Sequence, residues 1–350
     1  MKKSVFVLIL ALSFLLAPSC HSQNRSKELQ KNIISLPRQF YMHLKGQYFN
    51  MNSSMNITVI DTTAYITLLY KPSYRVISAV SSFKKLAFNH VILSNLASRD
   101  TLETWNAKFT SDTTLLLHVN NSFVDTNYLF TVNYDSSVHV QVTHFDTTIT
   151  DSATKQPLLI VSLNSLQIKN HSFKFLFTQT RLRTLFDSIY KHVKPDFKYY
   201  SPKSKNYFFP YYYNLLTSVL YNDNGLLVIS ANWYEYLGGA HGMNWVNYYN
   251  IDVKTGKILK LSDVLTNTDG IKDQIYNKLV EEKIPLFGGK SSIYIPQSFY
   301  VEGSTIYFVY PLYAIAPYYV GIISVPFDFK ELKDKLSPDF LAKYYPNIKL

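Results

Sequence analysis

The residues best suited to chemistry lie in a glycine-rich loop, residues 236–242, in the second half of the chain. Tyr236, Gly238, Gly239, His241 and the nearby Trp245 are the candidate ligand-binding residues. Adjacent glycines after strand-like sequence predict a sharply turned loop, because glycine readily adopts positive φ. A histidine there could be a base, a metal ligand or a ligand contact. No carboxylate or second histidine lies at ligand spacing, which favours hydrogen bonding of His241 to the loop backbone.

Other patterns for catalysis or metal binding are incomplete. Residues 288–291 resemble the end of a phosphate-binding loop, but Ile284 stands where that pattern requires glycine. His139, His144 and Asp146 resemble metal ligands, yet strand alternation places the two histidines on opposite faces. Neither H-E-x-x-H nor G-x-S-x-G occurs. We therefore predict no catalytic residue, no metal site and no cofactor.

Aromatic side chains are the remaining candidates for ligand contact. The chain has 29 Tyr and 23 Phe, and aromatic rings stack on sugars and also dominate protein interfaces. Packing within a sheet is the simpler role for most of them. We expect Trp245 to be exposed. The cluster around the loop comprises Tyr207, Tyr211, Tyr212, Tyr213, Trp233, Tyr234, Tyr236, Trp245, Tyr248 and Tyr249.

The elements that position this loop are expected to be mostly strands. Short alternating runs between residues 37 and 150 predict an N-terminal all-β meander or barrel-like domain. Residues 147–156 are a candidate linker. Helical spacing over residues 177–193 and from Ile271 to Leu279, with hairpins between them, predicts an α+β domain over residues 151–350. Asp269 is a candidate N-cap, and residues 329–336 a candidate helix. The predicted fold class is α+β with mostly antiparallel sheets.

The first residues of the chain predict export. Lys2 and Lys3 precede a short apolar run, which together form a signal peptide over residues 1–19. Cys20, the only cysteine, follows small residues and resembles the acceptor of a bacterial lipobox; an ordinary secreted protein with a free thiol is the alternative. Residues 20–36 would then be a lipid-anchored tether. We expect a membrane-anchored lipoprotein of the cell envelope, periplasmic or surface-exposed.

The charge balance is basic without pointing to a polyanionic partner. The chain carries 35 Lys and Arg against 24 Asp and Glu, a formal net charge of +11. These basic residues are spread thinly, with no arginine-rich run or nucleic-acid motif. We expect a basic solvated surface and no nucleic-acid partner.

Several separate blocks in the second half resemble a domain-of-unknown-function family of bacterial extracytoplasmic proteins. The same domain forms the external part of RsiV-type anti-sigma factors, which sense lysozyme, and precedes the catalytic domain of some peptidoglycan deacetylases. The resemblance therefore implies a binding or sensing module without chemistry of its own. The blocks are residues 236–241, Asp252, residues 255–257 and 261–265, Phe299, Tyr300, residues 310–318 and Gly321.

Residues and resemblance together predict a non-catalytic, lipid-anchored envelope protein that binds a lysozyme-like protein or peptidoglycan. Two alternatives stay open: a cell-wall glycan hydrolase or deacetylase, and a structural lipoprotein of an envelope complex.

Overall fold

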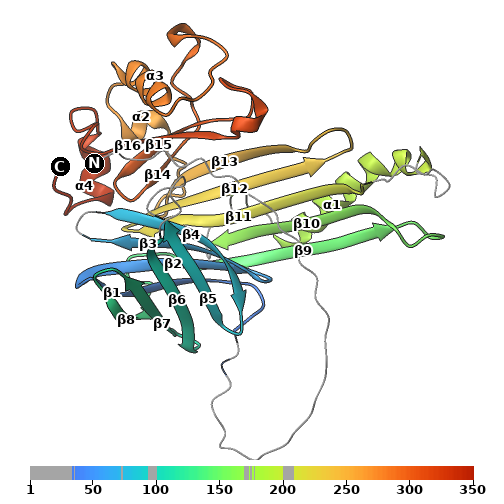
Figure 1. The fold of residues 1–350 in the computed structure, drawn as a ribbon, viewed down its shortest axis with the longest axis horizontal. Coiled ribbons are helices and arrows are strands. Elements are labelled where there is room, and N and C mark those ends of the chain that lie inside the picture. Colours follow the sequence, from blue (N-terminus) through green and yellow to red (C-terminus); the bar gives the residue numbers. More distant parts are fainter. Residues whose placement is uncertain are drawn as a thin grey trace, which may run out of the picture.

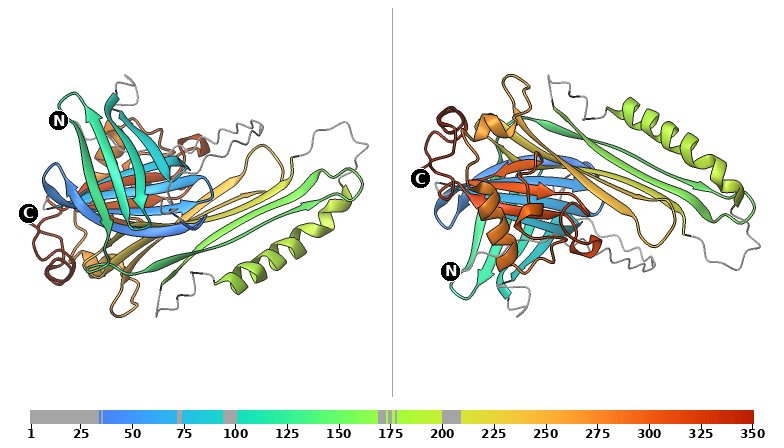
Figure 2. Two further views of the ribbon diagram at one scale, coloured as in Figure 1. Left: turned by 90° about the horizontal axis from the view of Figure 1, so that it is seen from below. Right: turned by 90° about the horizontal axis from the view of Figure 1, so that it is seen from above.

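The computed structural model describes residues 36–71, 74–93, 101–168, 178–199 and 209–350, together with residues 34, 173 and 176. These residues form an N-terminal barrel, a long five-stranded sheet and a C-terminal subdomain (Figure 1). The sheet extends well beyond the other two parts (Figures 1 and 2). The predicted α+β class, with a barrel-like N-terminus, is confirmed.

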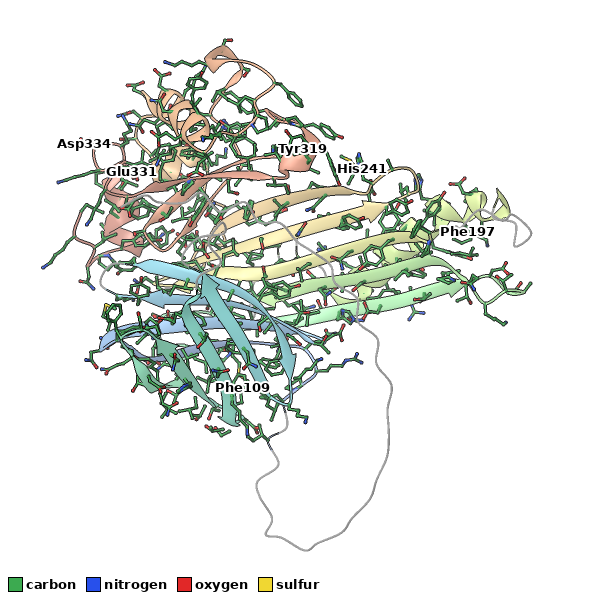
Figure 3. The ribbon with its side chains drawn as sticks, in the orientation of Figure 1. Phe109, Phe197, His241, Tyr319, Glu331 and Asp334 are labelled. Atoms are coloured by element: carbon green, nitrogen blue, oxygen red, sulfur yellow. The ribbon has the colours of Figure 1, made fainter. Side chains whose placement is uncertain are left out.

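The barrel is closed and antiparallel because its first strand pairs with its last, with Leu44 opposite Val132. Alternate side chains point inward and fill the interior with apolar rings, among them Trp105, Phe109 (labelled in Figure 3) and Phe130, all fully buried. Its strands are β1 (Phe40–Tyr48), β2 (Met51–Ile60), β3 (Thr63–Tyr70), β4 (Arg75–Lys84), β5 (Ala87–Leu93), β6 (Thr101–Ser111), β7 (Thr114–Asn121) and β8 (Asp125–Val132).

Strand β2 is buried on both faces because its outer face packs against the large sheet. Its outward Asn56 belongs to a polar layer between these two parts. The Tyr41 hydroxyl donates to Asn56 Oδ1 at 2.7 Å and accepts from Asn222 Nδ2 at 2.7 Å. This polar layer makes the packing of the barrel on the sheet specific, because each buried polar group requires a particular hydrogen-bond partner.

The large sheet has the order β13-β12-β11-β10-β9, and only its β10–β11 pair is parallel. Strand β9 pairs with β10, so the barrel ends with β8 rather than near residue 150, and residues 147–150 are strand rather than linker. The strands are β9 (Val140–Thr150), β10 (Pro157–Ile168), β11 (Tyr211–Asp223), β12 (Leu226–Tyr236) and β13 (Met243–Asp252).

A helix covers one face of this sheet. It is α1 (Gln179–Val193), in the connection between the parallel strands, as such a crossover requires, and the 3-10 helix η1 (Lys194–Tyr199) follows it (Figure 2). Leu182, Ile189 and Val193 form its apolar stripe and are buried against the sheet, which confirms the predicted helical spacing.

The C-terminal subdomain packs a three-stranded sheet against short helices around one apolar core. The helix predicted from Ile271 is present, but its N-cap is Gly270 and not Asp269. Residues 329–335 form turns rather than the predicted helix, and Leu336 pairs with Leu265 in an isolated β-bridge. The elements are α2 (Leu261–Val264), α3 (Ile271–Glu281), η2 (Lys290–Ser292), β14 (Phe299–Glu302), β15 (Thr305–Tyr310), η3 (Tyr318–Val320), β16 (Ile323–Asp328) and α4 (Pro338–Tyr344).

Candidate binding site

The glycine-rich loop connects β12 to β13 at the end of the sheet. Antiparallel pairing continues to Glu235 opposite Met243, so only residues 237–242 form the connection. Gly238 and Gly239 both have φ of 91°, a conformation that disfavours other residues. The Tyr236 hydroxyl donates to the Gly239 carbonyl at 3.0 Å and braces the turn. These residues shape the loop, as the sequence suggested.

His241 is held by its own loop and by the C-terminal subdomain. Its Nδ1 donates to the Gly242 carbonyl at 3.0 Å, which leaves Nε2 to accept from the Tyr313 hydroxyl at 3.5 Å. The imidazole stacks on Tyr318, with the ring centroids 3.9 Å apart. A backbone carbonyl and a phenol thus hold the imidazole ring in a fixed orientation.

Gly242 is the position where the loop meets the subdomain most closely. Its carbonyl accepts a second hydrogen bond, from the Tyr318 hydroxyl at 2.7 Å. A Cβ at Gly242 would collide with the Tyr234 ring and with the Glu235 carbonyl, so only glycine fits. Burial raises the pKa of Tyr234, with Tyr318 and Tyr236 adding to the effect, so its hydroxyl stays protonated at neutral pH.

Beside the contacts of His241 and Gly242, two tyrosine rings of the C-terminal subdomain are exposed to solvent. Tyr319 is 77% exposed and Tyr313 48% exposed, and both belong to the segment that holds His241. Figure 3 shows Tyr319 and His241 near one another, where the C-terminal subdomain meets the end of the large sheet. We call Tyr234, His241, Tyr313, Tyr318 and Tyr319 the aromatic platform. Flat rings with hydroxyl groups suit the stacking and hydrogen bonding that sugar rings offer.

Trp245 does not join this platform. It lies on β13 opposite Trp233, and the two rings stack at 6.3 Å. Strand alternation puts this pair on the α1 face of the sheet, where Trp233 packs, while Tyr234 and Tyr318 lie on the other face. Trp245 is 36% exposed, but on the wrong side for a ligand that contacts His241.

The platform tyrosines of the subdomain were not among the predicted site residues. Tyr313, Tyr318 and Tyr319 lie about 70 to 80 residues beyond His241, too far for local periodicity to reveal the contact. The sequence feature that could have pointed to these tyrosines is the tyrosine-rich block of residues 310–318, one of the blocks that carry the family resemblance.

The remaining predicted features lie elsewhere. Residues 1–19 and Cys20 are outside the described residues. No helix among the described residues is long and apolar enough to cross a membrane. Of the suspected metal ligands, His139 stacks on Tyr134 at 3.7 Å. His144 and Asp146 face Asp61 of the barrel, on the sheet edge opposite to β13.

The residues of the candidate site fall within two different family matches. Residues 152–244 match the family described as "Deacetylase PdaC", and residues 260–330 match a protein family of unknown function, DUF3298. His241 falls in the first match, and Tyr313 and Tyr318 fall in the second. The aromatic platform is therefore assembled from one segment that matches the first family and one that matches the second.

Two solved structures are similar to part of this chain, and the first of them supports its fold. A crystal structure of a DUF3298 family member from Bacteroides fragilis is 19% identical, with a TM-score of 0.50, and the match covers 61% of this chain and 100% of that one. A DUF3298 family protein from Pseudomonas aeruginosa PAO1 is 16% identical, with a TM-score of 0.41, covering 59% and 97%. No curated protein matches the chain.

Proposed function

We propose that the protein is a lipid-anchored cell-envelope lipoprotein, attached through Cys20, whose aromatic platform binds peptidoglycan glycan without catalysing a reaction. One observation carries the proposal. His241 is fixed between the Gly242 carbonyl and the Tyr318 ring, next to the exposed rings of Tyr313 and Tyr319. Pre-positioned rings stack on a ligand with little loss of conformational entropy.

Further rings extend the platform along the sheet. Tyr212 and Tyr234 are neighbours on β11 and β12 with ring centroids 5.8 Å apart, and both are only partly buried. They lie on the same sheet face as Tyr318. A linear glycan could contact successive rings along this line.

The contacts of His241 favour binding over deacetylation or hydrolysis. Its polar partners are a carbonyl and a phenol, and its neighbours on the platform are tyrosines. Tyrosine and histidine alone supply neither the carboxylate pair of glycan hydrolysis nor the metal set of a metal-assisted deacetylation. We expect no acetate release from N-acetylated glycan by the purified protein.

Calorimetric titration of the full-length protein with soluble peptidoglycan fragments tests the proposal. We expect saturable binding that Tyr319→Ala weakens about three- to tenfold, the usual loss for one stacking ring. His241→Ala should weaken it similarly. Phe123→Ala is the matched control, because Phe123 is 93% exposed on a barrel turn and should not contribute.

Lysozyme is titrated in parallel, since the resemblance to RsiV-type anti-sigma factors raises a protein ligand as the alternative. Binding of lysozyme but not of glycan would replace the proposed ligand and keep the binding role. Absence of binding to both, by a correctly folded protein, would overturn the proposed function.

A further inference from the structure

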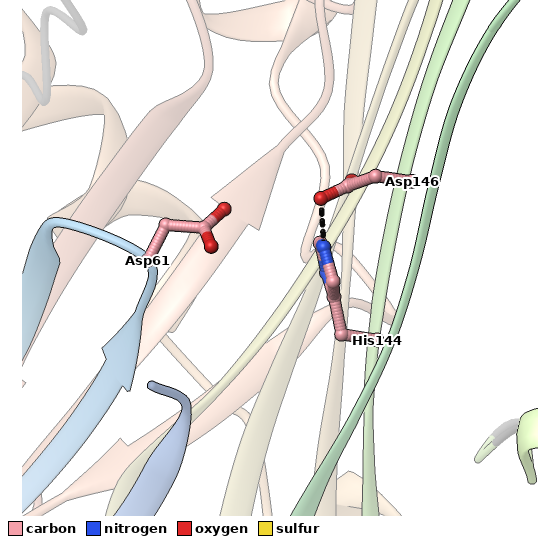
Figure 4. A group of neighbouring side chains, drawn as sticks. All are labelled: Asp61, His144 and Asp146. Carbon is pink, nitrogen blue, oxygen red and sulfur yellow. Dashed lines mark hydrogen bonds and ion pairs between the residues drawn. The ribbon is translucent and has the colours of Figure 1, made fainter. Parts of the chain in front are cut away.

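Three side chains that could hold a metal ion face one another where the barrel meets the large sheet. Asp61 lies in the turn between β2 and β3, and His144 and Asp146 lie on β9. One ligand atom from each side chain lies within 4.8 Å of those of the other two. Figure 4 shows the Asp61 carboxylate directed toward the His144–Asp146 pair.

The hydrogen bond on the far side of the imidazole determines which nitrogen faces the carboxylates. His144 Nδ1 lies 2.5 Å from Oδ1 of Asn164, the residue directly opposite on β10. An amide oxygen only accepts, so Nδ1 carries the proton. Nε2 is in contact with Asp146 Oδ2. The imidazole nitrogen and the carboxylate oxygen therefore face one another, an arrangement that suits a proton shared between them or a metal ion bound by both.

His118 provides a comparison for His144, because its two ring nitrogens contact the same kinds of partner. His118 Nδ1 lies 3.2 Å from Asn127 Oδ1, and its Nε2 lies 3.1 Å from Asp125 Oδ1. This arrangement is an exposed contact between one imidazole and one carboxylate. His144 is less exposed, at 15% against 37% for the side chain of His118, and it faces a second carboxylate.

That second carboxylate favours a divalent ion. One imidazole and two carboxylates form a donor set that suits a divalent transition-metal ion, whose charge balances both carboxylates. Arg38 also approaches this group, with its Nε 2.9 Å from Asp61 Oδ1. The Arg38 side chain is 81% exposed, so this ion pair contributes little to stability. The Asp61 carboxylate is therefore available to bind a metal ion.

We propose that Asp61, His144 and Asp146 bind a divalent transition-metal ion, with Zn²⁺ the best match to one imidazole and two carboxylates. A tetrahedral Zn²⁺ with bonds of about 2.0–2.2 Å places its ligand atoms roughly 3.3 Å apart, so only side-chain rotations are needed. Water would supply the fourth ligand. Asn164 acts as a positioning residue that fixes the imidazole tautomer.

The bound ion would join the barrel to the sheet. Asp61 belongs to the barrel, while both other ligands belong to the sheet. Metal binding to the folded state alone stabilises it in proportion to the logarithm of the free metal concentration. His144 and Asp146 lie on the edge strand β9, whereas His241 lies in the loop between β12 and β13 at the other edge of the sheet.

Titration of the chelator-treated full-length protein with Zn²⁺, and with Co²⁺ followed by visible absorption, tests the proposal. We expect one equivalent per chain and an increase in melting temperature. His144→Gln and Asp61→Asn should each weaken binding by at least about 100-fold, and Asn164→Ala by roughly 10- to 100-fold. Arg38→Gln, which removes a competing cation, should strengthen it. His118→Gln is the matched control and should bind as the wild type does.

Two results would overturn the proposal. One is a folded wild-type protein that binds neither ion. The other is equal binding by the wild type and His144→Gln, which would place any metal elsewhere. Either result would leave His144 and Asp146 as a hydrogen-bonded pair without a metal ion.

Discussion

Gly303 lies directly against Tyr74, whose carbonyl accepts a hydrogen bond from the neighbouring Ser304 amide at 2.8 Å. This contact joins the β14–β15 turn of the C-terminal subdomain to the chain segment between β3 and β4 of the barrel. Tyr74 itself is buried in the core of the subdomain. The barrel and subdomain are thus packed against each other through backbone as well as side chains.

Gly303→Ala should destabilise the protein strongly. The new Cβ would collide with the Tyr74 carbonyl oxygen, and the residue has φ of 58°. We expect a loss of about 3 kcal/mol or more in the free energy of unfolding, measured by urea titration. Gly225→Ala is the control, because Gly225 has φ of 78° with no atom near its Cβ position. It should cost only about 1 kcal/mol. Equal losses would contradict the role of the Tyr74 contact.

Gly242→Ala should impair ligand binding by the aromatic platform. A methyl group there displaces the Tyr234 ring, next to the carbonyl that orients both His241 and Tyr318. We expect roughly a tenfold loss of glycan affinity, measured by calorimetry. Gly239→Ala also lies in the loop and strains its backbone at φ of 91°, but its Cβ would meet nothing within 4 Å, so it measures backbone strain without the collision with Tyr234. A smaller effect of Gly242→Ala than of Gly239→Ala would refute this account of the loop.

Local patterns predicted much of this fold. The period of α1, the hairpin between β11 and β12 and the loop glycines are encoded within a few residues of one another. Barrel closure is not encoded locally, because it requires Leu44 of β1 to pair with the distant Val132 of β8. Strand β9 alternates much as barrel strands do, so its pairing with β10 is decided by tertiary contacts.

In the two candidate sites, too, some residues could be selected from local sequence, whereas others are brought together only by the fold. The sequence places His144 and Asp146 on one strand face, but only the fold brings Asp61 to them. His241 could be selected from its glycine neighbours, whereas Tyr318 reaches it through the packing of another subdomain. The position of Trp245 near the loop in sequence was misleading because alternation directs it to the other sheet face.

Asp252→Asn should loosen the C-terminal helix α4. Asp252 is buried at the end of β13, where it pairs with Lys343 and accepts from the Tyr344 hydroxyl at 2.6 Å. Burial of the Asp252 carboxyl opposes ionisation, but the hydrogen bonds from Lys343 and Tyr344 outweigh it and hold its pKa well below the usual range. We expect a loss of about 2 kcal/mol at pH 7.

The pH dependence follows from the depressed pKa of Asp252. Its stabilising contribution is present above the pKa of an unfolded aspartate, about 3.9, and is lost as the pH falls through the folded value. The difference between wild type and Asp252→Asn, measured by denaturant unfolding, should therefore be constant from pH 5 to 7 and shrink in stronger acid. Asp334→Asn, at an exposed position, should leave the wild-type curve unchanged. A difference that grew on acidification would contradict the assignment.

Glu302→Gln should stabilise the protein at alkaline pH. Glu302 is buried between the barrel and the C-terminal sheet, where the Ser78 hydroxyl donates to its Oε1 at 2.8 Å. Burial raises the pKa of Glu302 to about 7, and the hydrogen bond from Ser78 only partly opposes this. The folded state therefore holds a proton that the unfolded state has already lost above about pH 4.5.

The sign of the Glu302 effect is opposite to that of Asp252. The wild type should lose stability as the pH rises from about 4.5 to 7, on the order of 3 kcal/mol from this group, and little more above pH 7. Glutamine stays neutral and retains an acceptor for Ser78, so Glu302→Gln should match the wild type near pH 4.5 and exceed it at pH 8. Ser78→Ala, which removes the hydrogen bond to the ionised form, should shift the wild-type loss to higher pH. Parallel stability curves for wild type and Glu302→Gln across this range would show that the Glu302 carboxyl titrates normally.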